Sequence, residues 1–289
     1  MSDLVRPGTT RSGTVRPGAR PPRGVRRIGA VRAVYSGNAR VVVRRGLLAT
    51  KSTNWVVVVS GFFEPVFYLL AMGIGLGTYV GDVTTTAGTT VEYAAYIAPA
   101  LLAVSAMNGA VYDSTWNVFF KMHFGKLYDS MLSTSLGPLD VALGEISYAL
   151  VRGLVYAAGF LTVMQVLGLN LSWTAVLSLP AVVLIAFGFA SLGMAITSYM
   201  STFQQMDWVN IVMLPMFLLS ATFFPLTVYP EPVQWVIQAM PLWHAVELVR
   251  GLTTGALGPG TLVHVAYFVT MIAVGLFATT RRLRALFLG

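Results

Sequence analysis

The chain contains no cysteine, and only 10% of its 289 residues are charged. Without thiols it cannot form disulfides, use a thiolate nucleophile or hold a metal centre through cysteine. Soluble domains carry charge on about a quarter of their residues, so this chain has too few charges to cover a surface in water. Its 56% apolar content and mean hydropathy of +0.71 exclude a disordered chain and a soluble α/β enzyme. They predict an all-α integral membrane protein.

Motifs that carry chemistry are also missing. The sequence has no G-x-x-x-x-G-K-[ST] phosphate loop, so the chain is not expected to hydrolyse ATP itself. The glycines of 73–77 lack the strand and helix of a nucleotide fold, and indicate close helix packing or local unwinding. His123, His244 and His264 are far apart in the sequence, which disfavours a metal site. An intramembrane enzyme would need a cluster of His, Asp or Glu at one depth, and the sequence offers none. We also expect no cofactor in this chain.

Positive charge is concentrated at the N-terminus, where residues 1–51 hold 12 of the 19 lysines and arginines. Residues 1–25 are rich in Arg, Pro and Gly, which predicts a disordered basic cytoplasmic tail. Such an arm can bind nucleic acid, but before a membrane domain anionic lipid is the favoured partner, and no nucleic acid is expected. Residues 26–52 have apolar positions at roughly helical spacing and predict an amphipathic interfacial helix. A basic juxtamembrane anchor is an overlapping interpretation.

Residues 53–289 are predicted to form a domain of six transmembrane helices, because six stretches approach the roughly 20 apolar residues that a crossing helix needs. These stretches are 54–80, 93–112, 147–169, 177–199, 208–228 and 262–280. With the N-terminus inside, the inner segments hold 17 basic residues and the outer segments hold only Arg250. This asymmetry predicts cytoplasmic N- and C-termini, in a multi-pass protein of the cell inner (plasma) membrane.

Two connections between the predicted spans are unusually long. The inner segment 113–146 mixes aromatic and charged residues, which is typical of short helices that lie at an interface or dock on a partner. The outer segment 229–261 is apolar and aromatic, but too short for another full hairpin. Prolines at 230, 232 and 241 delimit short helices there. We predict that these outer helices before the last span are re-entrant or lie on the surface.

Two ionisable residues lie within predicted spans. Glu64 is costly in a membrane and is expected to face a cavity or a partner. It either lines a substrate route or gate, or is a buried structural acid next to Pro65, and proton coupling is a third alternative. Arg152 is interpreted as an anchor that reaches the inner surface rather than as a substrate ligand. In the outer segment, Glu247 and Arg250 have the i,i+3 spacing of a helical ion pair, although such residues commonly just solvate helix ends.

Several stretches of the sequence are distinctive in combination. They are E-P-V-F-Y-L-L leading to G-I-G-L-G (64–77), Y-D-S-M-L (128–132), G-P-L-D-V-A-L-G-E (137–145), S-A-T-F-F-P-L (220–226) and P-L-W-H-A-V-E-L-V-R (241–250). Together they resemble the type 2 ABC exporter permeases, in particular the nodulation-type lipo-oligosaccharide and daunorubicin-resistance-type permeases. The resemblance extends over about residues 40–280 and does not include the tail at 1–25.

The resemblance implies a non-enzymatic permease subunit of an ATP-driven ABC exporter. It would move an amphipathic substrate outward, such as a glycolipid, a lipo-oligosaccharide or a hydrophobic drug. Two permease chains, identical or related, would pair in the membrane and engage two copies of a separate ATPase subunit that holds ATP and Mg²⁺. The residues expected to couple to that ATPase are Lys126, Leu127, Tyr128, Asp129 and Met131. Those expected in the substrate pathway or its gate are Glu64, Tyr68, Phe224, Trp235, Trp243, His244 and Glu247.

An ion-coupled secondary transporter that uses Glu64 as its proton site is the alternative. It predicts that transport continues without any ATPase partner and that Glu64→Gln abolishes transport. A co-purifying ATPase would decide between the two interpretations.

Overall fold

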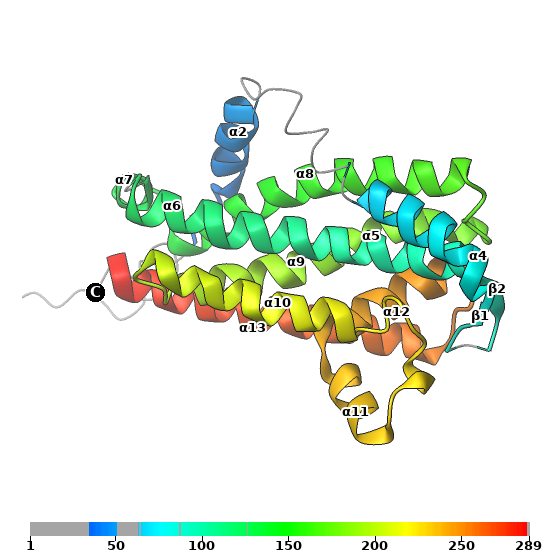
Figure 1. Ribbon diagram of the computed structural model, residues 1–289. Helices are drawn as coiled ribbons and strands as arrows, with labels where there is room; N and C mark the ends of the chain where they lie inside the picture. The colour runs from blue at the N-terminus through cyan, green and yellow to red at the C-terminus, as the bar shows by residue number, and fades with distance from the viewer. Residues whose placement is uncertain (1–34, 51–62, 64, 87, 126, 288–289) are drawn as a thin grey trace, which may run out of the picture.

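The computed structural model describes residues 35–50, 63, 65–86, 88–125 and 127–287. Its long helices lie side by side in a bundle, with short elements at both ends (Figure 1). We call one end the α7 end, because α6 (Val118–His123), α7 (Leu127–Leu132) and the last turns of α13 (Pro259–Phe287) lie there. The other is the hairpin end, after the strands β1 (Asp82–Thr84) and β2 (Thr90–Glu92). Lys126, Glu64 and the predicted tail at 1–25 lie outside the described residues.

The described elements follow one another along the chain. The helices of the first half are α2 (Ala39–Thr50), the π-helix η1 (Leu69–Leu76), α4 (Gly77–Val80), α5 (Tyr93–Tyr112), the π-helix η2 (Asp113–Asn117), α6 (Val118–His123), α7 (Leu127–Leu132) and α8 (Pro138–Val166). Those of the second half are η3 (Trp173–Leu177), α9 (Ser178–Thr197), η4 (Phe203–Met206), α10 (Asp207–Leu219), η5 (Leu226–Val228), α11 (Glu231–Ala239), α12 (Pro241–Thr254) and α13 (Pro259–Phe287).

Four helices of the described chain are long and apolar enough to cross a membrane. They are Tyr93–His123, Pro138–Val166, Trp173–Thr197 and Pro259–Leu286, and Pro65–Val80 is a shorter apolar helix. In this order, these five helices correspond to the predicted spans two, three, four, six and one. The chain is thus a helical, multi-pass membrane protein, whereas the number of six spans and the orientation of the termini stay predictions.

Three of the predicted spans missed an end of their helix. The second continues past Tyr112 through the π-helical turn η2 to His123, and the third helix begins at Pro138 rather than at residue 147. Pro at the start of α8 suits a first turn, where its missing N–H would have no partner in the helix. The last helix likewise continues beyond residue 280, so Arg281, Arg282 and Arg284 extend it.

The helix in the predicted fifth span is shorter than expected. α10 has 13 residues, which corresponds to about 20 Å along its axis. It ends at Leu219, and Ala221 adopts the left-handed conformation with φ of +54°. That conformation is unfavourable for a residue with a Cβ, so the turn after α10 must be held by its surroundings. The part of the predicted span after Leu219 is therefore not a continuation of this helix.

A two-stranded hairpin that the sequence analysis did not include lies between the first apolar helix and α5. β1 (Asp82–Thr84) pairs antiparallel with β2 (Thr90–Glu92), so that Asp82 lies opposite Glu92. Figure 1 places this hairpin at the end of the bundle away from α7.

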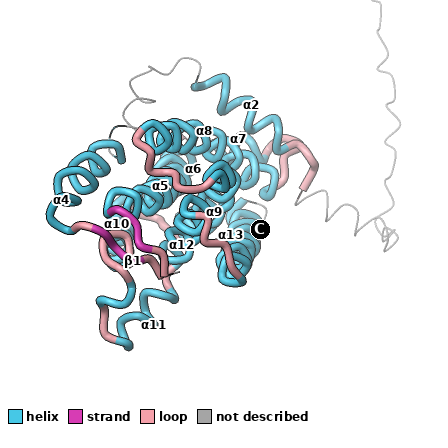
Figure 2. Tube along the Cα trace, turned by 90° about the vertical axis from the view of Figure 1, so that its right-hand side faces the viewer, coloured by secondary structure: helices cyan, strands magenta, loops and turns pink. Residues whose placement is uncertain are grey.

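The centre of the bundle is α5, whose side chains are almost all buried against α8, α9 and α12 (Figure 2). α9 and α13 pack closely because small residues face each other. A Cβ at Gly275 would lie 2.6 Å from the backbone carbon of Ser191, and one at Gly188 would lie 2.7 Å from the Phe268 ring. Such small-residue contacts are a common means of joining helices in membranes, where apolar surface alone gives little attraction between them.

α2 runs across the bundle rather than along it, against the outer side of α8 (Figure 1). α2 lies within the predicted interfacial segment 26–52, and its place at a membrane surface stays a prediction. Arg40 and Arg44 are exposed, whereas Val42 is 3% exposed and faces the bundle. One face of α2 therefore packs on the bundle, and the rest of its surface exposes Val41, Leu47 and Leu48 together with the arginines.

Candidate functional site

A large open cavity lies in the side of the bundle. Its volume is about 840 Å³, which is within the range of about 300–1,000 Å³ common for small-molecule sites. The walls come from α5 with η2, from α8, from α10 and from the described start of the first apolar helix. The lining residues are Pro65, Tyr68, Leu101, Val104, Ser105, Asn108, Gly109, Val111, Tyr112, Trp116, Asn117, Tyr156, Val209, Asn210, Met213, Leu214 and Phe217.

The lining combines aromatic rings with uncharged polar groups. Asn108 and Asn210 come from different helices, α5 and α10, and both residues line the cavity. Transfer of an unbonded amide from water into hydrocarbon costs roughly 2–7 kcal/mol. Lipid chains are therefore a poor filling for this cavity, and water, a polar molecule or another protein surface suits it better. Of the predicted gate residues that the structure describes, Tyr68 lines the cavity.

The predicted coupling residues lie at the α7 end. Tyr128 (0% exposed) and Met131 are buried, while Asp129 is exposed and Leu127 is half-buried. The short helix α7 is thus anchored by one face, and its other face is free for contact. Burial raises the pKa of Tyr128 well above its ordinary value, Glu145 raises it further and Arg45 lowers it.

An ion pair joins the helices on both sides of α7. The Lys121 amine at the end of α6 lies 2.5 Å from the Glu145 carboxylate of α8, and Glu145 is buried to 8% exposure. Because α7 lies between these helices in the chain, the pair closes the α6–α7–α8 elbow. Sequence analysis had placed Lys121 in the inner segment and Glu145 in the G-P-L-D-V-A-L-G-E stretch without assigning them to each other.

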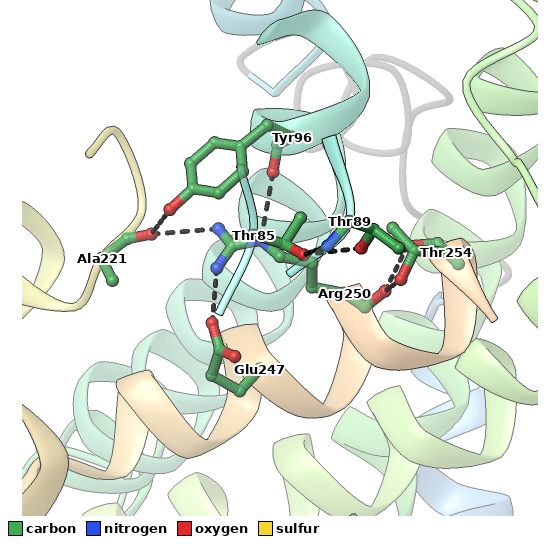
Figure 3. A network of polar contacts seen from close by, with 8 residues as sticks. Thr85, Thr89, Tyr96, Ala221, Glu247, Arg250 and Thr254 are labelled. Atoms are coloured by element: carbon green, nitrogen blue, oxygen red, sulfur yellow. Dashed lines mark hydrogen bonds and ion pairs between the residues drawn. The ribbon is translucent and has the colours of Figure 1, made fainter. Parts of the chain in front are cut away.

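The predicted gate residue Glu247 is part of a buried network nearer the hairpin end (Figure 3). Its carboxylate lies 2.5 Å from an Arg250 nitrogen, which confirms that the i,i+3 spacing allows a pair. Arg250 is 2% exposed, so it does not merely solvate a helix end. Its guanidinium also donates to the Ala221 carbonyl at 3.0 Å and lies 3.9 Å above the Tyr96 ring. The Tyr96 hydroxyl donates to the same carbonyl, at 3.2 Å.

Arg250 thereby explains the unusual backbone after α10. The Ala221 carbonyl accepts two hydrogen bonds, from α12 and from α5, and these contacts fix the left-handed residue in place. Three elements far apart in the sequence meet at one guanidinium. No pattern in the sequence links these elements, although an arginine in an otherwise apolar outer segment was a signal that it has a special role.

His244 and His264 meet, although their distance in the sequence argued against a joint site. Their Nδ1 atoms are 2.7 Å apart, and the Tyr267 ring stacks on His244. Burial and, to a smaller extent, the neighbouring His264 lower the pKa of His244 to about 4. At this distance one of the two facing nitrogens donates its N–H and the other accepts it. Within the described residues no group of three or more metal-ligating side chains gathers.

The other predicted gate residues lie apart from the cavity. Phe224 and Trp235 are exposed, Trp235 to 77% on α11. Trp243 contacts both histidines of the pair. The outer segment does contain two short helices, α11 and α12, which meet at Pro241 as predicted. Four of the residues grouped from the sequence as one pathway thus belong to three places, the cavity, the Arg250 network and the histidine pair, and Phe224 and Trp235 belong to none of these.

Comparison with known proteins identifies the architecture. Residues 38–253 match the ABC-2 type transporter family. The chain belongs to this family. Nodulation protein J of Rhizobium leguminosarum bv. viciae is 30% identical over 249 residues, which are 86% of this chain and 94% of that protein. Nodulation protein J of Sinorhizobium fredii is 30% identical over 83% of this chain and 90% of that protein, and that of Azorhizobium caulinodans is 22% identical over 81% and 92%.

As an ABC-2 transporter protein, the chain is the membrane subunit of a transport system. Proteins of this family normally work with an ABC ATPase subunit. The matched region runs from the start of α2 to the end of α12. It includes the cavity, the elbow around α7 and the Arg250 network.

Proposed function

We propose that this ABC-2 protein exports an amphipathic substrate, such as a glycolipid, a lipo-oligosaccharide or a hydrophobic drug, through the 840 Å³ cavity. The termini would face the cytoplasm, so that the α7 end is the inner end and the hairpin end the outer. Two copies of a separate ATPase, holding ATP and Mg²⁺, would dock at α7. The substrate would move from the inner side outward across the cell inner membrane.

The cavity carries this proposal because it has both halves of an amphipathic site. Tyr68, Trp116 and Phe217 offer apolar ring surface, and Asn108 and Asn210 offer amides that can bond a polar head group. α10, which forms one wall of the cavity, contributes no buried residue. A second permease chain that covers this face would give the polar lining a protein neighbour instead of lipid.

The arrangement at the α7 end supports coupling to an ATPase. α7 exposes Asp129 while Tyr128 fixes it to the bundle, and the elbow is closed by Lys121 and Glu145. A push on α7 would thus reach α5 through α6 and reach α8 directly. Coupling between distant sites requires such an element with two arrangements, which both sites can bias.

Export assays in proteoliposomes with the co-expressed ATPase test this function. Asn108→Leu combined with Asn210→Leu should lower cargo export at least tenfold, because the head group loses its partners in the cavity. Thr270→Leu, at an exposed position of α13, is the control, and this variant should export cargo at the wild-type rate. Export that continues with a hydrolysis-deficient ATPase would contradict the proposal and favour the ion-coupled carrier.

A further inference from the structure

A carboxylate is buried where the N-terminal helix meets the bundle. Asp140 lies in the first turn of α8 and is 0% exposed. It accepts hydrogen bonds from the backbone N–H groups of Gly137 at 2.9 Å, Ser36 at 2.7 Å and Asn38 at 2.8 Å. A buried carboxylate is costly unless it is bonded in this way. Asp140 therefore holds together two segments that are about a hundred residues apart.

The chain before α2 is shaped around this carboxylate. Gly37 has a φ of +79°, a conformation that glycine adopts without steric cost. The turn directs the N–H groups of Ser36 and Asn38 to the two carboxylate oxygens of Asp140, as in other anion-binding loops of the backbone. Since α2 begins at Ala39, the negative charge also lies at the positive end of the α2 dipole.

Beyond Asp140, α2 and α8 touch along their surfaces. A Cβ at Gly144 would lie 2.9 Å from the Ala39 carbonyl oxygen and would overlap the Val42 side chain. A Cβ at Gly46 would lie 2.7 Å from the Tyr148 ring. Each helix therefore has a glycine where the other approaches, and α2 rests on α8 with Asp140 at one end of the contact.

The same point also touches the connection that follows α7. α7 ends at Leu132, and residues 133–137 lead directly into α8. The Ser36 hydroxyl contacts both the Ser135 carbonyl in this connection and, at 2.9 Å, the Asp140 carboxylate. α2, the α7–α8 connection and the first turn of α8 thus meet at one carboxylate.

We propose that Asp140 is a positioning residue that makes α2 move together with α7 and α8 when the ATPase displaces α7. The inference rests on the proposed function, because it assigns the path by which the same export cycle reaches the interfacial helix. The ATPase need not touch α2. Motion of α7 carries the start of α8, and the three backbone bonds to Asp140 carry the start of α2 with it.

Distance measurements between spin labels test the mechanical part. The chain has no cysteine, so Arg40→Cys on α2 and Ser133→Cys after α7 can be labelled without background. Both positions are exposed. In vesicles, we expect the same narrow distribution of label distances for the chain alone and for the chain with its ATPase trapped with ATP. Asp140→Asn should broaden it, because an amide nitrogen cannot accept the backbone N–H groups. Asp207→Asn, at an exposed first-turn aspartate of α10, should leave it unchanged.

Cargo exported per ATP hydrolysed tests the functional part, since a purely structural role would lower export and hydrolysis together. We expect Asp140→Asn to keep ATP hydrolysis but to lower this ratio at least fivefold, at the lower end of the roughly 5- to 150-fold of typical coupling. An unchanged distance distribution would overturn the inference. A broadened distribution with a normal ratio would also overturn it, because α2 would then move independently without loss of coupling.

The two proposals fail in different ways. If the wild-type chain exports no cargo with its ATPase, the proposed function fails, while the label distances in vesicles of the chain alone still report on the contact with Asp140. If Asp140→Asn does not accumulate in the membrane, Gly144→Val separates the same helices one turn further along α8, where Ala39 and Val42 of α2 approach. It should broaden the distances and lower the ratio as well, and a normal result for both would refute the inference.

Discussion

Replacement of Arg250 by methionine is expected to destabilise the hairpin end of the bundle. Methionine keeps much of the apolar volume of the side chain but removes the guanidinium. Glu247 then loses its partner at 2.5 Å, and the Ala221 carbonyl loses its donor at 3.0 Å. Tyr96 loses the cation that lies 3.9 Å above its ring.

The expected loss follows from the burial of both charges. Arg250 and Glu247 have side chains that are 3% and 12% exposed. Removal of one partner of a buried pair costs roughly 3–5 kcal/mol, because the other charge is left unpaired. A desolvated cation over an aromatic ring contributes up to about 2 kcal/mol. Since both effects involve the same guanidinium they are not additive, and we expect a loss of about 4 kcal/mol in the free energy of unfolding.

Thermal unfolding of the purified protein in detergent measures this loss. For a chain of this size, about 4 kcal/mol corresponds to a fall in Tm of roughly 10 °C. Glu247→Gln together with Arg250→Met removes both charges, and it should be less destabilising than Arg250→Met alone. Glu231→Gln removes an exposed acid of the neighbouring α11 and should change the stability by less than about 0.5 kcal/mol.

Two results would refute this reasoning. Arg250→Met could lower the Tm no more than Glu231→Gln does, which would mean that the guanidinium contributes nothing at this position. Alternatively, the double variant could be as unstable as Arg250→Met, which would mean that the unpaired carboxylate is not the cause. A loss of export without loss of Tm would instead indicate a direct contact with cargo.

Three further predictions concern the rest of the bundle. Burial lowers the pKa of His244 from 6.5 to about 4. The free energy of unfolding should therefore be highest above about pH 6.5 and fall by at most about 3 kcal/mol as the pH is lowered to 4. His244→Gln should flatten this part of a Tm-against-pH curve. Gly275→Ala should lower the Tm by the equivalent of about 1–3 kcal/mol, whereas Gly153→Ala, with open space around its Cβ position, should not. Glu145→Gln should uncouple ATP hydrolysis from export, and exchange of Lys121 and Glu145 for each other should restore part of the coupling, as measured by cargo moved per ATP.

The long helices could be predicted because a crossing helix needs a long apolar run, whatever its partners. Their ends were harder to predict, since a charge was taken as the end of a span. Asp113 shows why this fails. Its side chain is buried to 7% exposure and accepts from Asn117 at 2.6 Å inside the π-helical turn, so the helix continues to His123. A polar residue whose partner is one turn away does not interrupt a helix in a membrane.

The contacts that organise the two ends could not be predicted from one sequence. The hydrogen bond between Arg250 and the Tyr96 carbonyl joins residues 154 positions apart, and that between Asp140 and the Ser36 backbone joins residues 104 positions apart. Local spacing carries no information about such distant pairs. The spacing did predict the pair of Glu247 with Arg250, because these residues are one helical turn apart. The candidate gate residues lie apart in the structure for the same reason. They were grouped by residue type, and residue type does not show which of them lie close together.

Among the described residues, the buried charges explain how a chain with so little charge specifies one arrangement of helices. Apolar helix faces gain little from one another in lipid, so close packing at positions such as Gly275 determines how near two helices come but discriminates weakly between partners. A buried charge is selective, because only one neighbour at its depth can satisfy it. Lys121 with Glu145 and Asp140 with the start of α2 do this at the α7 end, and Arg250 does it nearer the hairpin end. The cavity lies between them, and its wall on α10 contributes no buried residue. The cavity's wall on α10 is therefore left free to meet cargo or a second chain.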